Sequence, residues 1–359
     1  MRFYGSALCA AVALALLAGC SANSPATGTV PSTGAAVPTG AHGRFVPVWS
    51  ENATLVPDAL RPVVPMPLHG RPAPDTAVAG GVYVTEFYST DLYGFERQNK
   101  TNNPPSCTLS GVVFPNDVAS DDRGNIIVPD GGSRSVNVYK GSGKCGSLIG
   151  SFHDRSGQPS DATSMNAEKD VIAVAHIYSS KGFGHRGGTV TLCTIAGSCA
   201  TPLVNANMYE VGGVAMSRGG DCWVTALNGS GTPTMTYFQG CQGAGVTATG
   251  FLNANIGGLD IDTDGNIVSI SSYDAKAYVY SGCNPGCKLV SGPFKLNGEA
   301  IFGHLNRQAM ALATADFQYG QVDVYMYTPK KIKYLYSFNN GLSTTDVVEG
   351  VAFAPRSHE

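Results

Sequence analysis

Charged residues are scarce in this sequence of 359 residues, because Asp, Glu, Lys and Arg make up only 14% of it and the formal net charge is −3. A nucleic-acid-binding domain usually carries a clustered excess of Lys and Arg. The short basic run KKIK at residues 330–333 lies between two predicted strands, and we interpret it as a solvated turn. The composition therefore predicts no nucleic-acid partner.

Several catalytic fingerprints are also missing. The sequence contains no G-x-S-x-G nucleophile elbow, no H-E-x-x-H zinc motif and no P-loop. The C-x-x-C and His spacings of zinc sites are absent as well. These absences exclude the enzyme classes that depend on such motifs, but not enzymes without a short local signature.

The chain begins with an export signal. Arg2 precedes an apolar run of 12 residues, Ala7 to Ala18, which is too short to span a bilayer as a helix. The run ends in Leu-Ala-Gly-Cys at residues 17–20, which resembles the bacterial lipobox. That resemblance implies a signal peptide of residues 1–19, cleavage before Cys20 and acylation of the Cys20 sulfur, which anchors a protein stably in a membrane. The other interpretation is an ordinary secretory signal that ends in a cysteine by chance.

We therefore expect an exported protein in the cell envelope. In a bacterium with two membranes, Ser21 beside Cys20 favours the outer membrane, facing the periplasm or the cell surface. Residues 20–78 are predicted to be a tether, because Ser, Thr, Pro, Gly and Ala dominate the first part and Pro recurs through the second. Pro at this density excludes helices and central strands from the segment.

A pattern that recurs about every 45 residues organises the rest of the chain. Its clearest copies are PNDVASDDRGNIIVPD at 115–130, GGVAMSRGGDCWVTA at 212–226 and GGLDIDTDGNIVSISS at 257–272. The six equivalent positions are Asn116, Asp161, Gly212, Gly257, Glu299 and Glu349. Their spacings are 45, 51, 45, 42 and 50 residues, and each period holds about four short β-branched runs separated by Asp, Gly or Asn turns. The sequence therefore predicts an all-β fold, a β-propeller over residues 79–359.

The two ends of the chain predict how this ring closes. Residues 349–359, EGVAFAPRSHE, contain a first strand but no second strand. The segment that begins at Gly80 starts with a second strand and has no first strand before it. Together the two segments supply one period. We therefore predict six blades, one of them shared between the N- and C-terminal segments, so that no sheet edge is left exposed.

Eight cysteines remain once Cys9 is removed with the signal and Cys20 is acylated. An even number of cysteines in an exported protein favours disulfides over free thiols. Two pairs flank single predicted hairpins, a third lies at one end of one blade, and the last is assigned by elimination. In that order, the predicted disulfides are Cys193–Cys199, Cys283–Cys287, Cys222–Cys241 and Cys107–Cys145.

Carboxylates are predicted near the axis. The start of each first strand lies near the centre of a propeller, so the six equivalent positions of the repeat are expected to face one another. Oxygen ligands at these positions suit a hard cation such as Ca²⁺ or another divalent ion. The predicted ligands are Glu349, Asn116 and Asp161. If no cation is bound, mutual repulsion is expected to raise the pKa of at least one of these carboxyl groups.

The loops between second and third strands are expected on the same face, where propellers usually bind. The predicted binding mouth comprises Glu299, Glu86, Asp130, His176, Asn228, Tyr273 and Asp316. His176 and His185 flank the longest of these loops. They suit a general base or a lid, or a surface loop with solvated imidazoles.

The repeat GVAxDxxGNIxVxDxxxxxVxVY resembles the NHL and gluconolactonase-type (SMP-30-like) six-bladed propellers over residues 80–359. In the lactonases, Glu, Asn, Asn and Asp from four successive first strands hold a divalent cation. Glu349 and Asn116 match that set, whereas Asp161 replaces the second Asn. Gly212 stands where the resemblance implies an Asp that is both ligand and catalytic base. The resemblance therefore implies the fold but leaves lactonase activity without its base.

Two classes of function remain open from the sequence. The first is a membrane-anchored, non-enzymatic lipoprotein whose propeller binds a protein, a glycan or a small molecule. The alternative is a metal-dependent hydrolase of the lactonase type. A quinone-dependent dehydrogenase has less support, because the sequence shows no evident His and Arg constellation for the cofactor.

Overall fold

The computed structural model describes residues 81–96, 102–121, 123–141, 145–153, 157–166, 171–179, 187–272, 274–306, 310–343 and 347–354. For residues 141, 157–166 and 178–179 it describes the backbone alone. The predicted signal peptide, the lipidation site Cys20 and the tether lie outside this range. Within it, no helix has the length and apolar character needed to cross a membrane.

The described strands form six sheets, which we number as blades 1 to 6. Blade 1 contains β23 (Val348–Phe353), β1 (Val82–Glu86), β2 (Asp91–Phe95) and β3 (Cys107–Ser110). Blade 2 contains β4 (Ala119–Ser120), β5 (Asn125–Asp130), β6 (Ser135–Gly141) and β7 (Cys145–His153). Blade 3 contains β8 (Gly157–Asn166), β9 (Val171–Ser179) and β10 (Thr189–Thr194).

The remaining three blades have four strands each. Blade 4 contains β11 (Glu210–Met216), β12 (Cys222–Leu227), β13 (Pro233–Phe238) and β14 (Val246–Thr247), with a 3₁₀ turn at Gln239–Cys241. Blade 5 contains β15 (Leu259–Ile261), β16 (Ile267–Ser271), β17 (Lys276–Ser281) and β18 (Lys288–Lys295). Blade 6 contains β19 (Ala300–Leu305), β20 (Ala311–Asp316), β21 (Gln321–Thr328) and β22 (Lys331–Phe338).

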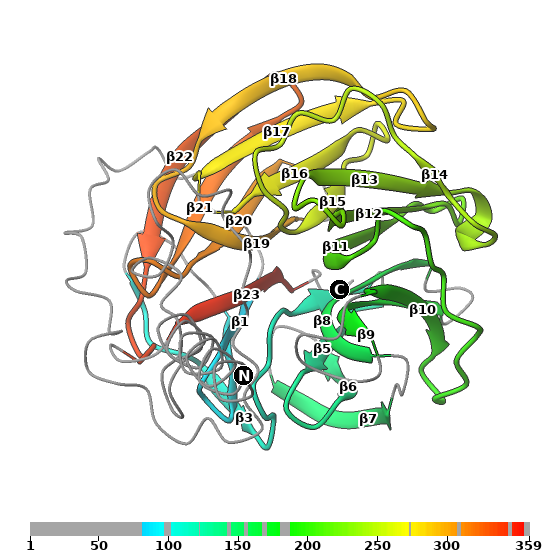
Figure 1. Ribbon diagram of the computed structural model, residues 1–359. Helices are drawn as coiled ribbons and strands as arrows, with labels where there is room; N and C mark the ends of the chain where they lie inside the picture. Colours follow the sequence, from blue (N-terminus) through cyan, green and yellow to red (C-terminus); the bar gives the residue numbers. More distant parts are fainter. Residues whose placement is uncertain are drawn as a thin grey trace, which may run out of the picture.

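The sheets are arranged around a common centre (Figure 1). Each first strand contacts the next one, from β4 through β8, β11, β15 and β19 to β23 and back to β4. All pairings within the six sheets are antiparallel, as short connections between sequential strands require. The predicted all-β propeller is confirmed.

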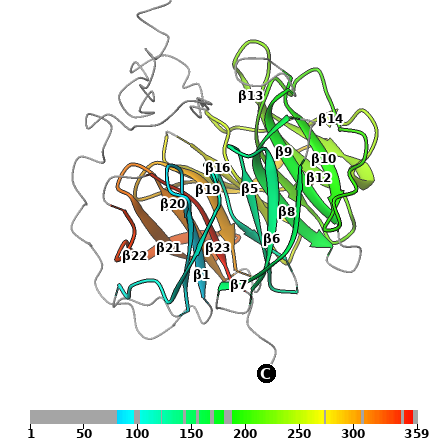
Figure 2. The ribbon, with the colours of Figure 1, turned by 90° about the horizontal axis from the view of Figure 1, so that it is seen from below.

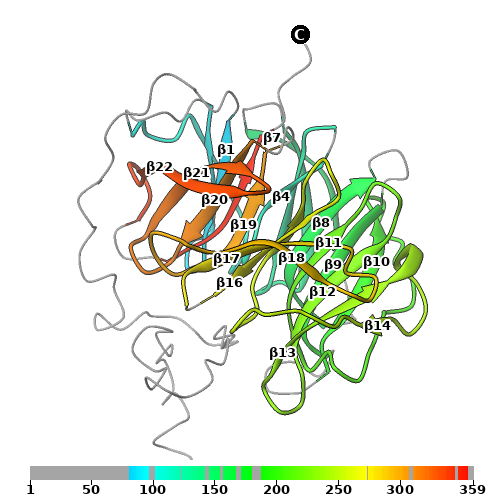
Figure 3. The ribbon, with the colours of Figure 1, turned by 90° about the horizontal axis from the view of Figure 1, so that it is seen from above.

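The closure through both termini is also confirmed. β1 pairs with β23 on one side and with β2 on the other, in a register that places Val82 opposite Phe353. The two strands lie side by side when the ring is turned to either side (Figure 2, Figure 3). The C-terminal strand is therefore the innermost strand of the blade that the N-terminal segment begins.

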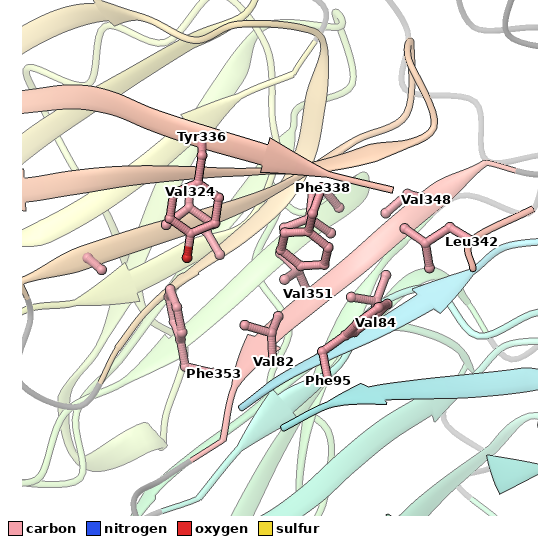
Figure 4. Packing of buried hydrophobic residues seen from close by; sticks show 14 of the residues in the cluster. Val82, Val84, Phe95, Val324, Tyr336, Phe338, Leu342, Val348, Val351 and Phe353 are labelled. Carbon is pink, nitrogen blue, oxygen red and sulfur yellow. The ribbon is translucent and has the colours of Figure 1, made fainter. Parts of the chain in front are cut away.

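Blade 1, to which both termini contribute, is called the closing blade below. An apolar cluster packs it against blade 6. The ring centroids of Phe95 and Phe338 are 5.0 Å apart, and Val82 and Val351 pack beside them (Figure 4). All four side chains are less than 3% exposed. Burial of an aliphatic or aromatic side chain of this size contributes about 1.5–3 kcal/mol, so this cluster holds the two termini in the ring.

Blade 3 differs from the prediction of four strands per period, since only three strands form its sheet. The segment 198–203 runs along the free edge of β10 instead. The backbone N–H of Val190 donates to the carbonyl of Leu203 at 3.1 Å, and that of Ala200 donates to Leu192 at 2.8 Å. The outer edge is therefore covered without a regular fourth strand, which limits unwanted strand pairing.

The Asp-x-x-Gly-Asn turns between first and second strands make the same hydrogen bonds in blades 2 and 5. In blade 2, both carboxylate oxygens of Asp121 accept hydrogen bonds from Asn125, from its backbone N–H and its side-chain amide, each at 2.7 Å. Asp262 and Asn266 repeat this arrangement in blade 5, at 2.8 and 2.9 Å. The Gly before each Asn has a positive φ, which glycine adopts without steric cost.

The repeated glycine of the first strands marks where neighbouring blades approach most closely. A Cβ on Gly350 would lie 2.6 Å from the Cα of Asp117, at the entry of blade 2. A Cβ on Gly257 would lie 2.7 Å from the carbonyl oxygen of Ile301 in blade 6. The recurrence of Gly-Val-Ala and Gly-Leu-Asp therefore reflects packing between first strands.

The structure contains all four predicted disulfides, Cys107–Cys145, Cys193–Cys199, Cys222–Cys241 and Cys283–Cys287. Three of them lie within single blades. Cys107 of β3 and Cys145 of β7 instead join the closing blade to blade 2, with Cα atoms 5.7 Å apart. A Cβ on Gly94 would lie 2.6 Å from the Cys107 sulfur, so a glycine is needed beside this bridge.

Candidate functional site

Most of the polar side chains predicted at the mouth are buried and hold loops. Glu86 is fully buried, and its Oε1 accepts a hydrogen bond from the backbone N–H of Ser343 at 2.5 Å. Asp130, which is 1% exposed, accepts from the N–H groups of Val113 at 2.8 Å and Ser133 at 2.9 Å. Each carboxylate thus lies at the end of the second strand of a blade and holds the loop that leads into the first strand of the same blade.

His176 and Asn228 occupy similar positions in blades 3 and 4. The His176 side chain is buried, and its Nδ1 lies 3.2 Å from the Thr189 hydroxyl oxygen. The amide oxygen of Asn228 accepts from the N–H groups of Ser230 and Thr232 and closes its own turn. Tyr273 and His185 lie outside the described residues.

Asp316 belongs to a buried pair of carboxyl groups in blade 6. The Nε2 atom of Gln321 lies between the pair, 2.9 Å from Asp323 Oδ1 and 3.4 Å from Asp316 Oδ2. Burial and the charge of Asp323 raise the pKa of Asp316 to about 9. Burial also raises the pKa of Asp323, although hydrogen bonds from Ser337, Asn297 and Gln321 oppose it. The pair therefore keeps one proton at neutral pH.

Glu299 is half-buried at the entry of β19, and burial raises the pKa of its carboxyl group. Its neighbour Gly298 passes directly over the Asp316 carboxyl group, since a Cβ there would lie 2.0 Å from Asp316 Oδ2. The carboxyl pair therefore supports the 297–299 loop, as Glu86 and Asp130 support their loops. Glu86, Asp130 and Asp316 thus lie at the ends of second strands, and their part in a binding mouth stays a prediction.

The centre of that end is filled by the apolar residues next to them in sequence. Phe87 follows Glu86, Ile177 follows His176 and Phe317 follows Asp316. These three belong to one cluster with contributions from every blade, and only the region around the axis is shared by all six. We call this set the axial plug: Phe87, Ile177, Leu227, Ile256, Ile301, Phe302 and Phe317, with Tyr88, Phe114 and Val347 packed against it.

Aromatic rings form the least buried part of the axial plug. Phe87 lies 4.7 Å from Tyr88 and 5.6 Å from Phe114, measured between ring centroids, and Tyr88 lies 6.3 Å from Phe114. Tyr88 and Phe114 are half-buried, whereas Phe87 is buried. Sequence reasoning missed these residues, and a signal was present for Phe87 alone, which follows the polar Glu86 at the end of β1.

Farther along the axis, three charged side chains meet from three blades. His304 Nε2 of β19 lies 3.0 Å from Asp117 Oδ2, and His304 Nδ1 lies 3.6 Å from Asp260 Oδ2 of β15. Asp260 also accepts the backbone N–H of Leu305 at 2.7 Å. Burial lowers the pKa of His304, but the carboxylates of Asp117 and Asp260 outweigh it and raise this pKa well above its ordinary value.

The predicted metal ligands lie on three consecutive first strands or their entries. Glu349 is buried in β23, Asn116 is buried just before β4, and the Asp161 backbone in β8 pairs with Ala175. The described side chains contain no group of three or more His, Cys, Asp or Glu residues placed to hold a metal ion. The Asp161 side chain lies outside that description, so this site stays a prediction.

Gly212 cannot accept the missing carboxylate without rearrangement. A Cβ at this position would lie 2.9 Å from the Cβ of Ile256, within the axial plug. Cβ atoms essentially never approach an apolar side chain that closely in folded proteins, which pack without spare volume. The position that the lactonase resemblance assigns to a catalytic base is therefore an interblade packing position here.

No protein-family profile and no curated protein matches the sequence. Solved structures do resemble the fold. A chain of a nidogen/laminin complex matches 76% of this chain and 98% of its own, with a TM-score of 0.57 and 11% identity.

Two further structures come from Desulfotomaculum acetoxidans and Bacteroides caccae, and both are of proteins without a known function. Their TM-scores are 0.51 and 0.53, their identities 12% and 10%, and each covers 77% of this chain and 99–100% of its own. At these identities the likeness shows the β-propeller fold alone, and a closer relation to NHL or SMP-30 proteins stays a prediction.

Proposed function

We propose that this protein is an exported, lipid-anchored binding protein that holds a ligand or partner at the mouth of its propeller and does not catalyse a reaction there. The half-buried aromatic rim of the axial plug, formed by Tyr88 and Phe114, carries this proposal. Tyr88 and Phe114 combine a large apolar surface with little conformational freedom, which suits recognition. The two rings lie in loops held by a rigid set of blades, which is where binding residues usually lie.

The placement of the polar residues supports binding rather than catalysis. A general base must lie within hydrogen-bond reach of a substrate. Glu86 and Asp130 are almost fully buried and accept backbone N–H groups of their own loops. The metal-dependent lactonase alternative has less support, because Gly212 packs against Ile256 where that chemistry needs a carboxylate.

Attachment to a membrane rests on the sequence alone. The lipobox-like residues 17–20 and the Pro-rich segment 20–78 suit a propeller held away from a membrane by an acylated Cys20. Cys20→Ala is expected to move the protein from the membrane fraction to the soluble fraction. A mature wild-type chain that lacks acyl groups by mass spectrometry would contradict this part of the proposal.

Site-directed photo-crosslinking in intact cells tests binding at the mouth. A benzophenone amino acid replaces Tyr88 in one variant and Leu148, which is 53% exposed on the outer strand β7, in a matched control. Only the position 88 variant is expected to form an adduct, and the additional substitution Phe114→Gly is expected to abolish it. Equal adducts at both positions, or none at position 88, would refute a binding role for this face.

A further inference from the structure

The described loop residues around the mouth include few charged side chains. The described segments at this end of the propeller are 87–90, 111–116, 131–134, 187–188, 209, 228–232, 254–258, 272, 274–275, 297–299, 317–320, 343 and 347. Their charged side chains are Arg134, Asp274 and Glu299, and Asp274 already pairs with Lys276 at 3.1 Å. Within these described segments, a ligand with several formal charges would find few complementary partners.

Short uncharged polar groups replace charges in these loops. They supply hydroxyl and amide groups that both donate and accept hydrogen bonds. The exposed or half-exposed examples are Ser89, Thr90, Ser133, Asn228, Ser230, Thr232, Asn297, Gln318 and Ser343. Such groups match the hydroxyl rim of a sugar, whereas protein interfaces are enriched in Arg and Met and depleted in Ser.

Aromatic residues from four blades stand among these polar groups. Tyr88 lies in blade 1, Phe114 at the entry of blade 2, Tyr209 at the entry of blade 4 and Tyr319 in blade 6, and all four are half-buried. Their positions at strand ends place them at the same face as the axial plug, which Tyr88 and Phe114 contact directly. Aromatic faces pack well against the apolar C–H face of a sugar ring.

The backbone holds Phe114 in an unusual conformation. Its φ is +51°, which costs energy for a bulky residue other than glycine. The Phe114 carbonyl accepts the N–H of Gly131 at 3.1 Å, and the adjacent Val113 N–H donates to Asp130 at 2.8 Å. The buried Asp130 turn thus fixes the Phe114 ring beside Tyr88, as a binding platform requires.

We propose that the mouth binds a neutral carbohydrate, with the perpendicular rings of Tyr88 and Phe114 (interplanar angle 88°) as the aromatic platform and the surrounding hydroxyl and amide groups as hydrogen-bond partners. This inference rests on the proposed binding function and names its ligand class. A neutral sugar needs no charged partner when it leaves water, and its hydroxyl groups need the dense hydrogen bonding that these loops offer.

Binding of the purified full chain to arrayed oligosaccharides tests the proposal. The probes are neutral glucans, mannans, galactans and N-acetylglucosamine oligomers, with sulfated and uronic-acid oligosaccharides for comparison. Phe114→Gly removes the ring and keeps a backbone that tolerates φ +51°. Tyr88→Ser removes the second ring, and Leu148→Ser is the control on the outer strand.

We expect at least one neutral probe to bind, and each platform substitution to weaken that binding about tenfold or more, which corresponds to about 1.4 kcal/mol. Leu148→Ser is expected to bind like the wild type. No binding to any neutral probe, binding to the anionic probes alone, or equal binding by the platform variants would overturn the proposal. A position 88 photo-adduct with a protein in cells, without any sugar binding, would leave the proposed function intact and refute the carbohydrate inference.

Discussion

The imidazole of His304 lies 3.0 Å from the carboxylate of Asp117, although 187 residues separate the two in the chain. They belong to blades 6 and 2, which are not neighbours, because the closing blade stands between them. Gly350 of that blade packs against the Asp117 backbone and leaves room for the contact. The ion pair therefore connects two blades across the innermost strand of a third.

Removal of this pair is expected to destabilise the ring. Asp117→Asn leaves a protonated, buried His304 without its closest counter-charge, at a cost of about 3 kcal/mol measured by chemical denaturation. The double variant Asp117→Asn/His304→Gln is expected to recover part of that loss, because the buried imidazolium is removed and Asp260 keeps its hydrogen bond from the Leu305 N–H. Asp264→Asn, at an exposed turn, is the control. Strictly additive effects of the two substitutions would show that the pair is not coupled.

The carboxyl pair in blade 6 predicts a pH dependence of stability. The folded state raises the pKa of Asp316 to about 9, so between about pH 4 and pH 9 the native protein holds a proton that the unfolded chain has released. Stability is therefore expected to fall as the pH rises through this range. Asp316→Asn is expected to flatten the slope and to raise the melting temperature most at pH 8–9. An unchanged slope in denaturation experiments across pH 5–9 would contradict the shared proton.

Gly212→Asp tests whether a lactonase site can be restored. The new side chain would meet Ile256, so we expect a loss of about 1–3 kcal/mol, as for other overpacked interiors, and no lactonase activity. Gly229→Asp is a matched control, because no atom lies within 4 Å of a Cβ at that position. Lactone hydrolysis by Gly212→Asp would show instead that the position faces a working metal site.

The four disulfides are expected to differ in their effect on stability. Chain entropy predicts about 4 kcal/mol for Cys107–Cys145 and about 2 kcal/mol for Cys193–Cys199, because their sequence separations are 38 and 6 residues. The longer bridge also joins the closing blade to its neighbour, and its loss is expected to loosen the ring. Thermal unfolding of the two double Ser variants measures the difference. Equal melting temperatures would contradict the ranking.

A cation at Glu349, Asn116 and Asp161 would stabilise the native state by mass action. Excess Ca²⁺ is then expected to raise the melting temperature, and Glu349→Gln or Asp161→Asn is expected to abolish that rise. Glu299→Gln, in blade 6, is the control for nonspecific charge effects. A melting temperature that divalent metal salts leave unchanged would exclude the site.

Sequence reasoning identified the elements that depend on local chemistry. The Asp-x-x-Gly-Asn turns, the cysteine pairs and the shared blade all follow from short patterns repeated at a regular period. The fourth strand of blade 3 was predicted incorrectly, because the segment 198–203 meets β10 through isolated bridges that leave no alternating pattern. Such an irregular edge leaves little trace in a local sequence.

The polar residues at the strand ends show where this reasoning stops. A pattern such as Glu86-Phe87 or Asp316-Phe317 indicates that successive side chains point in opposite directions, but not which of the two faces the axis. In the folded chain the apolar partner enters the axial plug and the acid anchors a loop. Hydrophobic burial in the region shared by six blades decides between these orientations.

By itself, the sequence determined the β-propeller, its closure and the hairpin cysteine pairs, because the repeat period, turn chemistry and hairpin spacing can be read directly from the order of residues, and it left Cys107–Cys145 as the remaining pair. Only the tertiary structure decided the contents of the axis, the contact of His304 with Asp117, and the aromatic rim at Tyr88 and Phe114. These features depend on contacts between residues of different blades, which come together only when the ring closes. Local preferences carry no information about those contacts.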